Sequence, residues 1–321
     1  MPRNKRITIA DVARTANVSR ALVSFVLNGR KEVAPATRVR IQQAINELGY
    51  RPNTVARNLA TKRAGAIGIV CDMETYQDAL GMQFLAAILT TSVELGQRVM
   101  LIPADDQQIQ EVAQDHAVDG IIFLDERVSD PCVAYLHEAG FPVVGLWDDH
   151  LDAILRKGVE ELALHLESRG HQRAVCLCGS SEKLFVTKYE RIVTATLQEY
   201  GIGVTTYYCP PHTEAEVAHS VVLDEKGNRA TVIIASSDRL AINAIHGLHA
   251  ARLRVPDDCA VSGFGDIPSA QWIQPPLTTI RLPVKALTSW AMIRMFQEEE
   301  ADKQQVLPKV PGSRLVVRRS C

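Results

Sequence analysis

Near the start of the chain, residues that can hydrogen-bond to DNA lie beside an apolar helical pattern. Ser19, Arg20 and Ser24 alternate with Val23 and Val26, which belong to an apolar stripe of helical spacing. An arginine guanidinium can bond to the edge of guanine in the major groove, which is worth about 1–3 kcal/mol of discrimination between bases. Serine hydroxyls can bond to phosphates, which orient a protein on DNA without specifying the bases. Recognition of DNA is therefore the chemistry that this segment favours.

Short helices joined by a tight turn would position these side chains. Thr8 and Asp11 suit a capping box for a first helix, Asn17 tolerates the positive φ of a turn, and Ser19 can cap a second helix. A third helix is expected from Pro35 to Leu48. Its inner stripe would be Val39, Ile41, Ala44, Ile45 and Leu48. This is the pattern of a helix-turn-helix, whose second helix enters the major groove.

The distribution of charge supports this interpretation. Residues 1–63 hold thirteen Lys and Arg against three Asp and Glu, so this part carries +10 and the rest −12, although the whole chain is only −2. A basic head on an acidic body presents one face to phosphate. The seven cysteines are scattered, without the spacing of a zinc site, which indicates free thiols in a reducing compartment. The sequence also lacks a signal core and a membrane span, so we expect a cytoplasmic protein.

Motifs of catalysis are missing from the sequence. We find no GxSxG, HExxH or Walker loop, and Gly263-Phe264-Gly265 lacks the third glycine of a dinucleotide fingerprint. The nine histidines are dispersed. We therefore expect a protein that is not an enzyme and that holds no cofactor and no metal.

With these motifs the sequence strongly resembles the lactose repressor (LacI/GalR-type) family of bacterial transcription regulators. The resemblance covers essentially the whole chain. The matching stretches are Thr8-Ile9-Ala10-Asp11-Val12-Ala13, Val18-Ser19, Val23-Ser24, Val26-Leu27-Asn28, Glu47-Leu48-Gly49-Tyr50-Arg51-Pro52-Asn53, Ala56-Arg57-Asn58-Leu59, Arg169-Gly170-His171-Gln172-Arg173, Val255-Pro256-Asp257-Asp258, Gly263-Phe264, Pro275-Pro276-Leu277-Thr278-Thr279 and Arg318-Arg319-Ser320.

The resemblance implies a DNA-binding head followed by a hinge helix. Residues 53–61 are too few for a stable isolated helix, so they would fold when two copies pair over the minor groove. Leu59 would then wedge into a base step and kink the duplex. Phe25 stands where many relatives have an arginine that reads guanine, although it can contact a thymine methyl. The expected DNA-binding residues are Thr8, Ser19, Arg20, Ala21, Ser24, Phe25, Asn28, Thr37, Tyr50, Asn53, Ala56, Arg57 and Leu59.

After Gly65 the pattern changes to short apolar runs separated by amphipathic stretches, which predicts parallel sheets covered on both faces. We assign the fold class as α/β with an all-α head. The chain would form a three-helix helix-turn-helix domain, a hinge helix and a two-lobed, doubly wound α/β core like that of periplasmic binding proteins. The head would span residues 1–51, the hinge helix and linker 52–64, and the core 65–321, with lobe 1 at about 65–148 and 279–305 and lobe 2 at about 152–276 and 312–321.

A small-molecule effector would bind between the lobes, at the carboxyl ends of the strands. The resemblance places Arg191 as a clamp for hydroxyls or a carboxylate, and Asp238 on the family's Asn-Asp pair, with Ser237 in place of the asparagine. Gly265 replaces an aspartate that commonly grips sugar hydroxyls. Trp147 lies where the first lobe often offers an acidic residue. The expected effector residues are Asp72, Tyr76, Trp147, Arg191, Ser237, Asp238, Asp266 and Trp272.

We thus expect a homodimeric regulator, most simply a repressor, of which the partners are double-stranded operator DNA and a sugar, sugar acid or related metabolite. The dimer would bury helix faces near Ala79–Leu95 and Leu240–Ala250. Ser237 and Gly265 leave open a constitutive dimeric regulator whose cleft binds no effector. A solute receptor is the other alternative, which the missing signal peptide and the intact head oppose.

Overall fold

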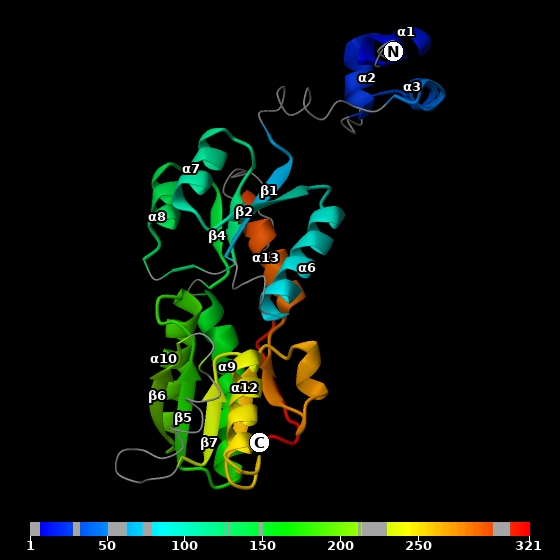
Figure 1. The fold of residues 1–321 in the computed structure, drawn as a ribbon. Coiled ribbons are helices and arrows are strands. Elements are labelled where there is room, and N and C mark those ends of the chain that lie inside the picture. The colour runs from blue at the N-terminus through cyan, green and yellow to red at the C-terminus, as the bar shows by residue number, and fades with distance from the viewer. Residues whose placement is uncertain are drawn as a thin grey trace. The chain divides into compact units, whose positions relative to one another are not determined.

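A computed structural model describes residues 7–27, 33–50, 63–72, 79–124, 126, 127, 129–147, 150–210, 213, 230–297 and 309–321. The chain divides into two compact units, Met1–Ala64 and Gly65–Cys321. Figure 1 shows helices alone in the first unit and both helices and strands in the second, so the expected fold class is confirmed.

The first unit, the head, contains α1 (Ile9–Thr15), α2 (Arg20–Leu27) and α3 (Pro35–Leu48). The capping box forms, because the backbone N–H of Thr8 donates to Asp11 Oδ2 at 2.9 Å and its hydroxyl donates to the same oxygen at 2.7 Å. Asn17 adopts a φ of 49° in the turn. Ser19 Oγ accepts from the N–H of Leu22 at 3.2 Å, which caps α2. The expected helix boundaries of the head are thus confirmed.

The small core of the head is apolar. Val12, Val23 and Ile41 have no exposed surface, and α3 adds Ala44. Val39 was wrongly assigned to the inner stripe of α3, since its side chain is 56% exposed. The reason is geometric: at about 100° per residue, Val39 lies about 200° around the helix from the buried Ile41.

Lobe 1 is built on a four-stranded parallel sheet of order β2-β1-β3-β4. Figure 1 shows α7 and α8 on one side of this sheet and α6 and α13 on the other. All residues of β1 are buried, as expected for a strand covered on both faces. The elements are β1 (Ala66–Cys71), α6 (Ala79–Glu94), β2 (Arg98–Pro103), α7 (Asp106–Gln114), β3 (Ile121–Phe123), α8 (Pro131–Glu138) and β4 (Val143–Gly145).

Lobe 2 is built on a six-stranded sheet of order β10-β9-β8-β7-β5-β6, in which only β10 is antiparallel to its neighbour. Helices α9 and α10 pack together, and α12 packs on β7 and β8. Its elements are α9 (His150–Ser168), β5 (Arg173–Cys178), α10 (Leu184–Glu199), β6 (Gly203–Tyr208), β7 (Val232–Ala235), α12 (Asp238–Ala250), β8 (Ala260–Phe264), the short 3₁₀ helix η1 (Pro268–Gln271), β9 (Thr278–Arg281) and β10 (Arg314–Val316).

The chain crosses back to lobe 1 through α13 (Val284–Gln297), which packs on α6, β3 and β4. We expected this return near Thr279, where β9 pairs with β8 in the second sheet. The crossing therefore follows Arg281. The reason is that the Thr278–Arg281 strand supplies the ladder on which β10 pairs.

The cysteines are core residues. All seven are buried thiols outside disulfides, as the scattered spacing predicted. Cys176 and Cys178 point to one face of β5, where their sulfur atoms lie 3.5 Å apart. The hydrogen bond with Cys178 and, second, burial raise the pKa of the Cys176 thiol. In the part of the chain that the structure describes, no helix is both long and apolar enough to cross a bilayer.

Candidate functional site

The start of α2 presents the side chains that can reach bases. Ser19, Arg20 and Ala21 are exposed there, and the exposed Thr8 lies at the start of α1. Thr37, in the first turn of α3, is half-buried. The head thus holds its polar and basic side chains on regular helices with capped ends, as a rigid reader of DNA requires.

Two expected DNA contacts also serve the head itself. Phe25 and Tyr50 are half-buried and pack against the core cluster of the head. Phe25 therefore offers only part of its ring to a base. Ser24 is half-buried on α2, and the expected contacts Asn28, Asn53, Ala56, Arg57 and Leu59 lie outside the described residues, so they stay predictions.

In the second unit, some of the expected effector residues lie where the carboxyl ends of the two sheets meet. Asp72 follows β1 and bonds across the cleft to Lys183, with Nζ to Oδ2 at 3.3 Å. Trp147 follows β4, and its ring lies against Phe185 of α10. Gly265 follows β8, and a Cβ built on it would lie 3.4 Å from Leu80 of α6. These contacts define the cleft between the lobes.

Asp238 is fully occupied by the protein itself. Its Oδ1 accepts from the hydroxyl of Thr279 at 2.5 Å and its Oδ2 accepts from the N–H of Ile267 at 2.7 Å. Burial raises the pKa of the Asp238 carboxyl to about 6, despite these two hydrogen bonds. The neighbouring Ser237 caps α12 by accepting from the N–H of Leu240. Asp238 therefore ties β9 and the loop after β8 to α12.

Asp266 is committed in the same way. Its carboxylate forms ion pairs with Arg281 and, at 2.6 Å, with Arg318, and only 5% of its side chain is exposed. The preceding Gly265 has a φ of 125°, a conformation that other residues rarely adopt. The loop after β8 thus brings backbone, and not a carboxylate, to the cleft.

Two further expected residues point elsewhere. The Arg191 side chain is 62% exposed on α10 and pairs with Asp152 of α9 at 2.5 Å. At about 100° per residue it lies about 200° around the helix from the buried Tyr189, and so on the other side of α10. Trp272 follows η1 and is 79% exposed on the surface. Neither is brought to the cleft, and Tyr76 lies outside the described residues.

Aromatic rings that were not among the expected effector residues surround Trp147 between the lobes. Trp147 contacts Phe84 of α6 at 5.6 Å between ring centroids and Phe185 of α10 at 4.4 Å. Phe185 continues to Tyr189 at 5.7 Å and to Phe264 at 5.1 Å. The only available sequence signal was the helical spacing of Phe185 and Tyr189, which put both on one face of α10.

The polar atoms of this cluster are bonded inside the protein. The indole N–H of Trp147 donates to the carbonyl of Leu124 at 2.7 Å. The Tyr189 hydroxyl donates to the carbonyl of Ala235 at 3.3 Å, and burial raises the pKa of that phenol. The rings therefore present faces and edges to the cleft, and no free donor from these two groups.

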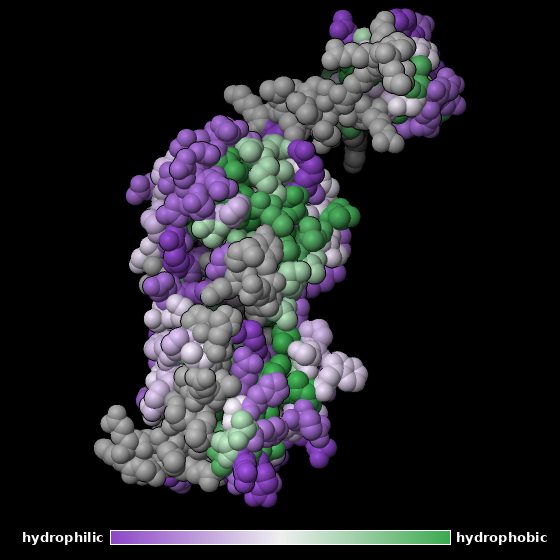
Figure 2. Space-filling view, in the orientation of Figure 1, coloured by the Kyte–Doolittle hydropathy of each residue, from purple (hydrophilic) through white to green (hydrophobic). Residues whose placement is uncertain are grey.

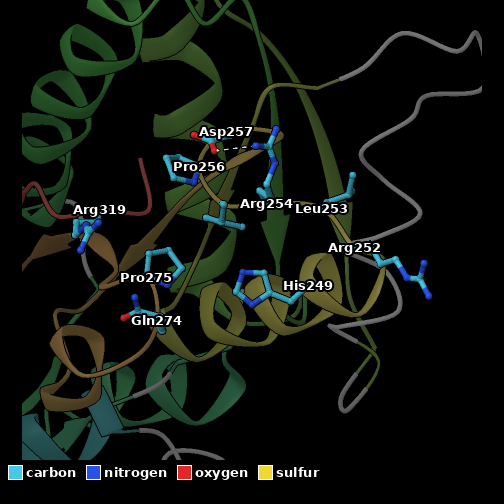
Figure 3. Close-up of a pocket in the computed structure, with 10 residues that line it drawn as sticks. His249, Arg252, Leu253, Arg254, Pro256, Asp257, Gln274, Pro275 and Arg319 are labelled. Atoms are coloured by element: carbon cyan, nitrogen blue, oxygen red, sulfur yellow. Dashed lines mark ion pairs between the residues drawn. The ribbon is translucent and has the colours of Figure 1, made fainter.

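A separate pocket of about 540 Å³ lies at the other end of lobe 2. Figure 3 shows His249 and Pro275 facing each other across it, Arg319 above Gln274, and the Arg254–Asp257 ion pair at its rim. Apart from Arg319, which follows the antiparallel β10, these residues precede β8 and β9 or end α12, so the pocket lies at the amino ends of the parallel strands. It contains none of the expected effector residues.

Comparison with known proteins agrees with this organisation. Residues 8–53 match the bacterial regulatory proteins of the lacI family, and residues 163–321 match the periplasmic binding protein-like domain. The HTH-type transcriptional regulator CelR of Thermobifida fusca is 30% identical over an alignment of 309 positions that covers 89% of this chain and 90% of CelR. The chain belongs to the lacI family. This lacI-family member is therefore a DNA-binding transcription regulator.

Solved structures show the fold of this lacI-family chain. The Lac repressor dimer bound to operator and the anti-inducer ONPF matches with a TM-score of 0.79 at 24% identity, over 98% of this chain and 99% of that one. The complex of the transcriptional regulator CelR with cellobiose matches with a TM-score of 0.69 at 23% identity, over 98% of this chain and 100% of that one. The expected family and architecture are confirmed.

Proposed function

We propose that this lacI-family chain is a transcriptional repressor that binds a pseudo-palindromic operator as a dimer and responds to a small molecule in the cleft between its lobes. The observation that carries the proposal is the head, in which Ser19, Arg20 and Ala21 are exposed at the capped start of α2. The protein would act in the cytoplasm and without catalysis. The Lac repressor with its operator is a relative in fold that supports this role.

Operator binding tests the proposal directly. DNA selected from a random pool by the full chain should contain two related half-sites, one for each head. Arg20→Ala should weaken binding to the selected site and relax the preference at one base pair of each half-site, by about 1–3 kcal/mol per contact. Arg254→Ala, which removes a surface charge from lobe 2, is the matched control. A pool without enrichment would contradict the proposal.

The hinge is tested by one substitution. Leu59→Ala should lower operator affinity and reduce DNA bending, because the leucine side chain is expected to open a base step. Gel mobility of circularly permuted operator fragments measures the bend. If affinity and bend are both unchanged, the wedge is wrong while recognition by the head stands.

An apolar face on lobe 1 supports the dimer. Figure 2 shows hydrophobic residues gathered over α6 and the neighbouring β2, which is the outer strand of its sheet. Apolar surface on an edge strand favours pairing with a second chain. The exposed residues are Met82, Leu89, Val93, Leu95, Met100 and Leu101. By contrast, the exposed positions of α12 are Arg239, His246, His249 and Ala250.

The cleft supports control by a ligand, because the relative CelR holds cellobiose in a complex of the same fold. A constitutive regulator is the second candidate, since Asp238 and Asp266 are both occupied by internal partners. A thermal-shift screen of sugars, sugar acids and nucleosides separates the two. Stabilisation by one class supports the responsive regulator, and normal operator binding with no shift supports the constitutive one.

A further inference from the structure

The cleft of this chain is closed by its own aromatic residues. Phe185 is the central ring, because it touches Trp147 of lobe 1 and both Tyr189 and Phe264 of lobe 2. Trp147 is only 5% exposed, and Tyr189 and Phe264 are not exposed at all. Such ring pairs are worth about 0.5–1.5 kcal/mol beyond the area that they bury. The aromatic contact therefore joins the lobes where an effector would lie.

The first turn of α10, which carries Phe185, is also fastened to lobe 1. The N–H of Leu184 donates to the carbonyl of Glu126 at 2.8 Å, and Lys183 forms a backbone bridge with Arg127. Lys183 Nζ lies 3.3 Å from Asp72 Oδ2. Backbone bonds and an ion pair thus hold the residue before Phe185 against the opposite lobe.

Two carboxylates that were expected to grip a polyhydroxylated ligand are committed elsewhere. Asp238 bonds to Thr279 and Ile267, and Asp266 pairs with Arg281 and Arg318. Gly265 has no side chain. A sugar entering this space would lose hydrogen bonds to water and regain few from the protein, which is unfavourable.

We propose that Phe185 is an internal occupant of the effector cleft, which holds the lobes in the operator-binding geometry without a ligand. A compound that regulates the protein must displace the Phe185 ring from Trp147. It must therefore carry a flat aromatic ring, and not a sugar. This inference rests on the proposed function, in which lobe geometry controls DNA affinity.

The test is removal and replacement of the ring in the full-length protein. Phe185→Ala should lower operator affinity about tenfold, a usual size for coupling between two sites. Because an apolar cavity stays dry and accepts small rings, added indole should fill the vacated space and restore affinity. Leu197→Ala is the matched control, since it removes a fully buried side chain from the same helix. It should lower thermal stability and leave operator affinity unchanged.

The distance between the lobes is a second measurement, which a loss of stability alone would not change. Glu138→Cys in lobe 1 and Gln198→Cys in lobe 2 place exposed thiols for spin labels, while the native cysteines are buried. Labelled chains are diluted with unlabelled protein, so that each measured distance lies within a single chain. Phe185→Ala should broaden or lengthen the distance distribution, and indole should narrow it again.

The outcomes separate this inference from the proposed function. Unchanged affinity and lobe distance in a folded Phe185→Ala protein would overturn the inference. So would an effect equal to that of Leu197→Ala with no rescue by indole, or a response of the wild-type protein to glucose or cellobiose. In each of these cases operator binding by the wild type would stand. A wild-type protein that selects no DNA site would instead overturn the proposed function.

Discussion

Asp238 shows how burial and hydrogen bonds compete at a single carboxyl. Its pKa is raised to about 6 from the ordinary 3.8, because burial outweighs the bonds from Thr279 and Ile267. Between these two values the folded chain binds the proton more tightly than the unfolded chain. The free energy that this group contributes is therefore greatest below about 3.8 and is lost as the pH rises through about 6.

Asp238→Asn should flatten this dependence. The amide can keep both contacts, with its Oδ1 accepting from Ile267 and its Nδ2 donating to the Thr279 hydroxyl. The difference in unfolding free energy between wild type and variant, measured by denaturant titration from about pH 4 to about pH 7, should shift in favour of the variant as the pH rises. Parallel curves would show that Asp238 does not titrate in this window.

The positive φ of Gly265 leads to a second prediction for a single residue. Gly265→Ala forces a side chain onto a φ of 125° and should cost about 1–3 kcal/mol of stability. Gly179→Ala is the control, because an added Cβ there meets nothing within 4 Å and its φ is not positive. Thermal unfolding of both variants measures the difference. Equal melting temperatures would mean that the loop relaxes without cost.

Sequence motifs located the loops of the cleft better than the side chains within them. The motif around Gly263-Phe264 led to the end of β8, yet the directions of Asp238 and Asp266 depend on Thr279 and Arg281 of β9 and on Arg318 after β10. Arg191 is another example, because its direction depends on Asp152 of α9, with which it pairs. Partners distant in sequence cannot be read from a local motif.

At the scale of elements, periodicity and caps were sufficient for the helices and strands. α3 begins and ends where Pro35 and Leu48 predicted, and the run Ala66–Cys71 is β1. The sheet to which β9 belongs could not be predicted in this way, because the sequence of a short Thr-rich strand does not indicate which strands it pairs with. Its partners β8 and β10 decide that.

The segment after β10 packs against β8 and β9 of the second sheet, and Ser320 is the residue that holds it there. The hydroxyl of Ser320 accepts from the N–H of Thr278 at 2.8 Å and donates to the carbonyl of Val261 at 2.6 Å, with no exposed surface. Ser320→Ala should cost about 1–3 kcal/mol, because both backbone groups lose a buried partner. Ser168→Ala, which removes an exposed hydroxyl, should change stability by less than about 0.5 kcal/mol. Denaturant unfolding compares them, and equal costs would contradict the anchor.

At the scale of the whole molecule, the apolar face on α6 and β2 decides whether two heads can act together. Leu89→Asp should convert the dimer to a monomer, because a carboxylate would be buried without a partner in the interface. Leu164→Asp on α9 is the matched control, since this leucine is 52% exposed outside that face. Sedimentation velocity measures the mass, and operator affinity should fall with it. A Leu89→Asp protein that remains dimeric would place the interface elsewhere.

The backbone at Gly265 also constrains how this regulator can diverge. An aspartate at this position would have to adopt a φ of 125°, so a carboxylate cannot be introduced here by one substitution without strain. The built Cβ would also meet Leu80 of the other lobe at 3.4 Å. A variant that is to bind a sugar through a carboxylate at this position must therefore first have a different backbone conformation in the loop after β8. At this glycine the main-chain conformation, and not a side chain, limits which residues can be accommodated. A change of ligand specificity here therefore requires several coordinated substitutions.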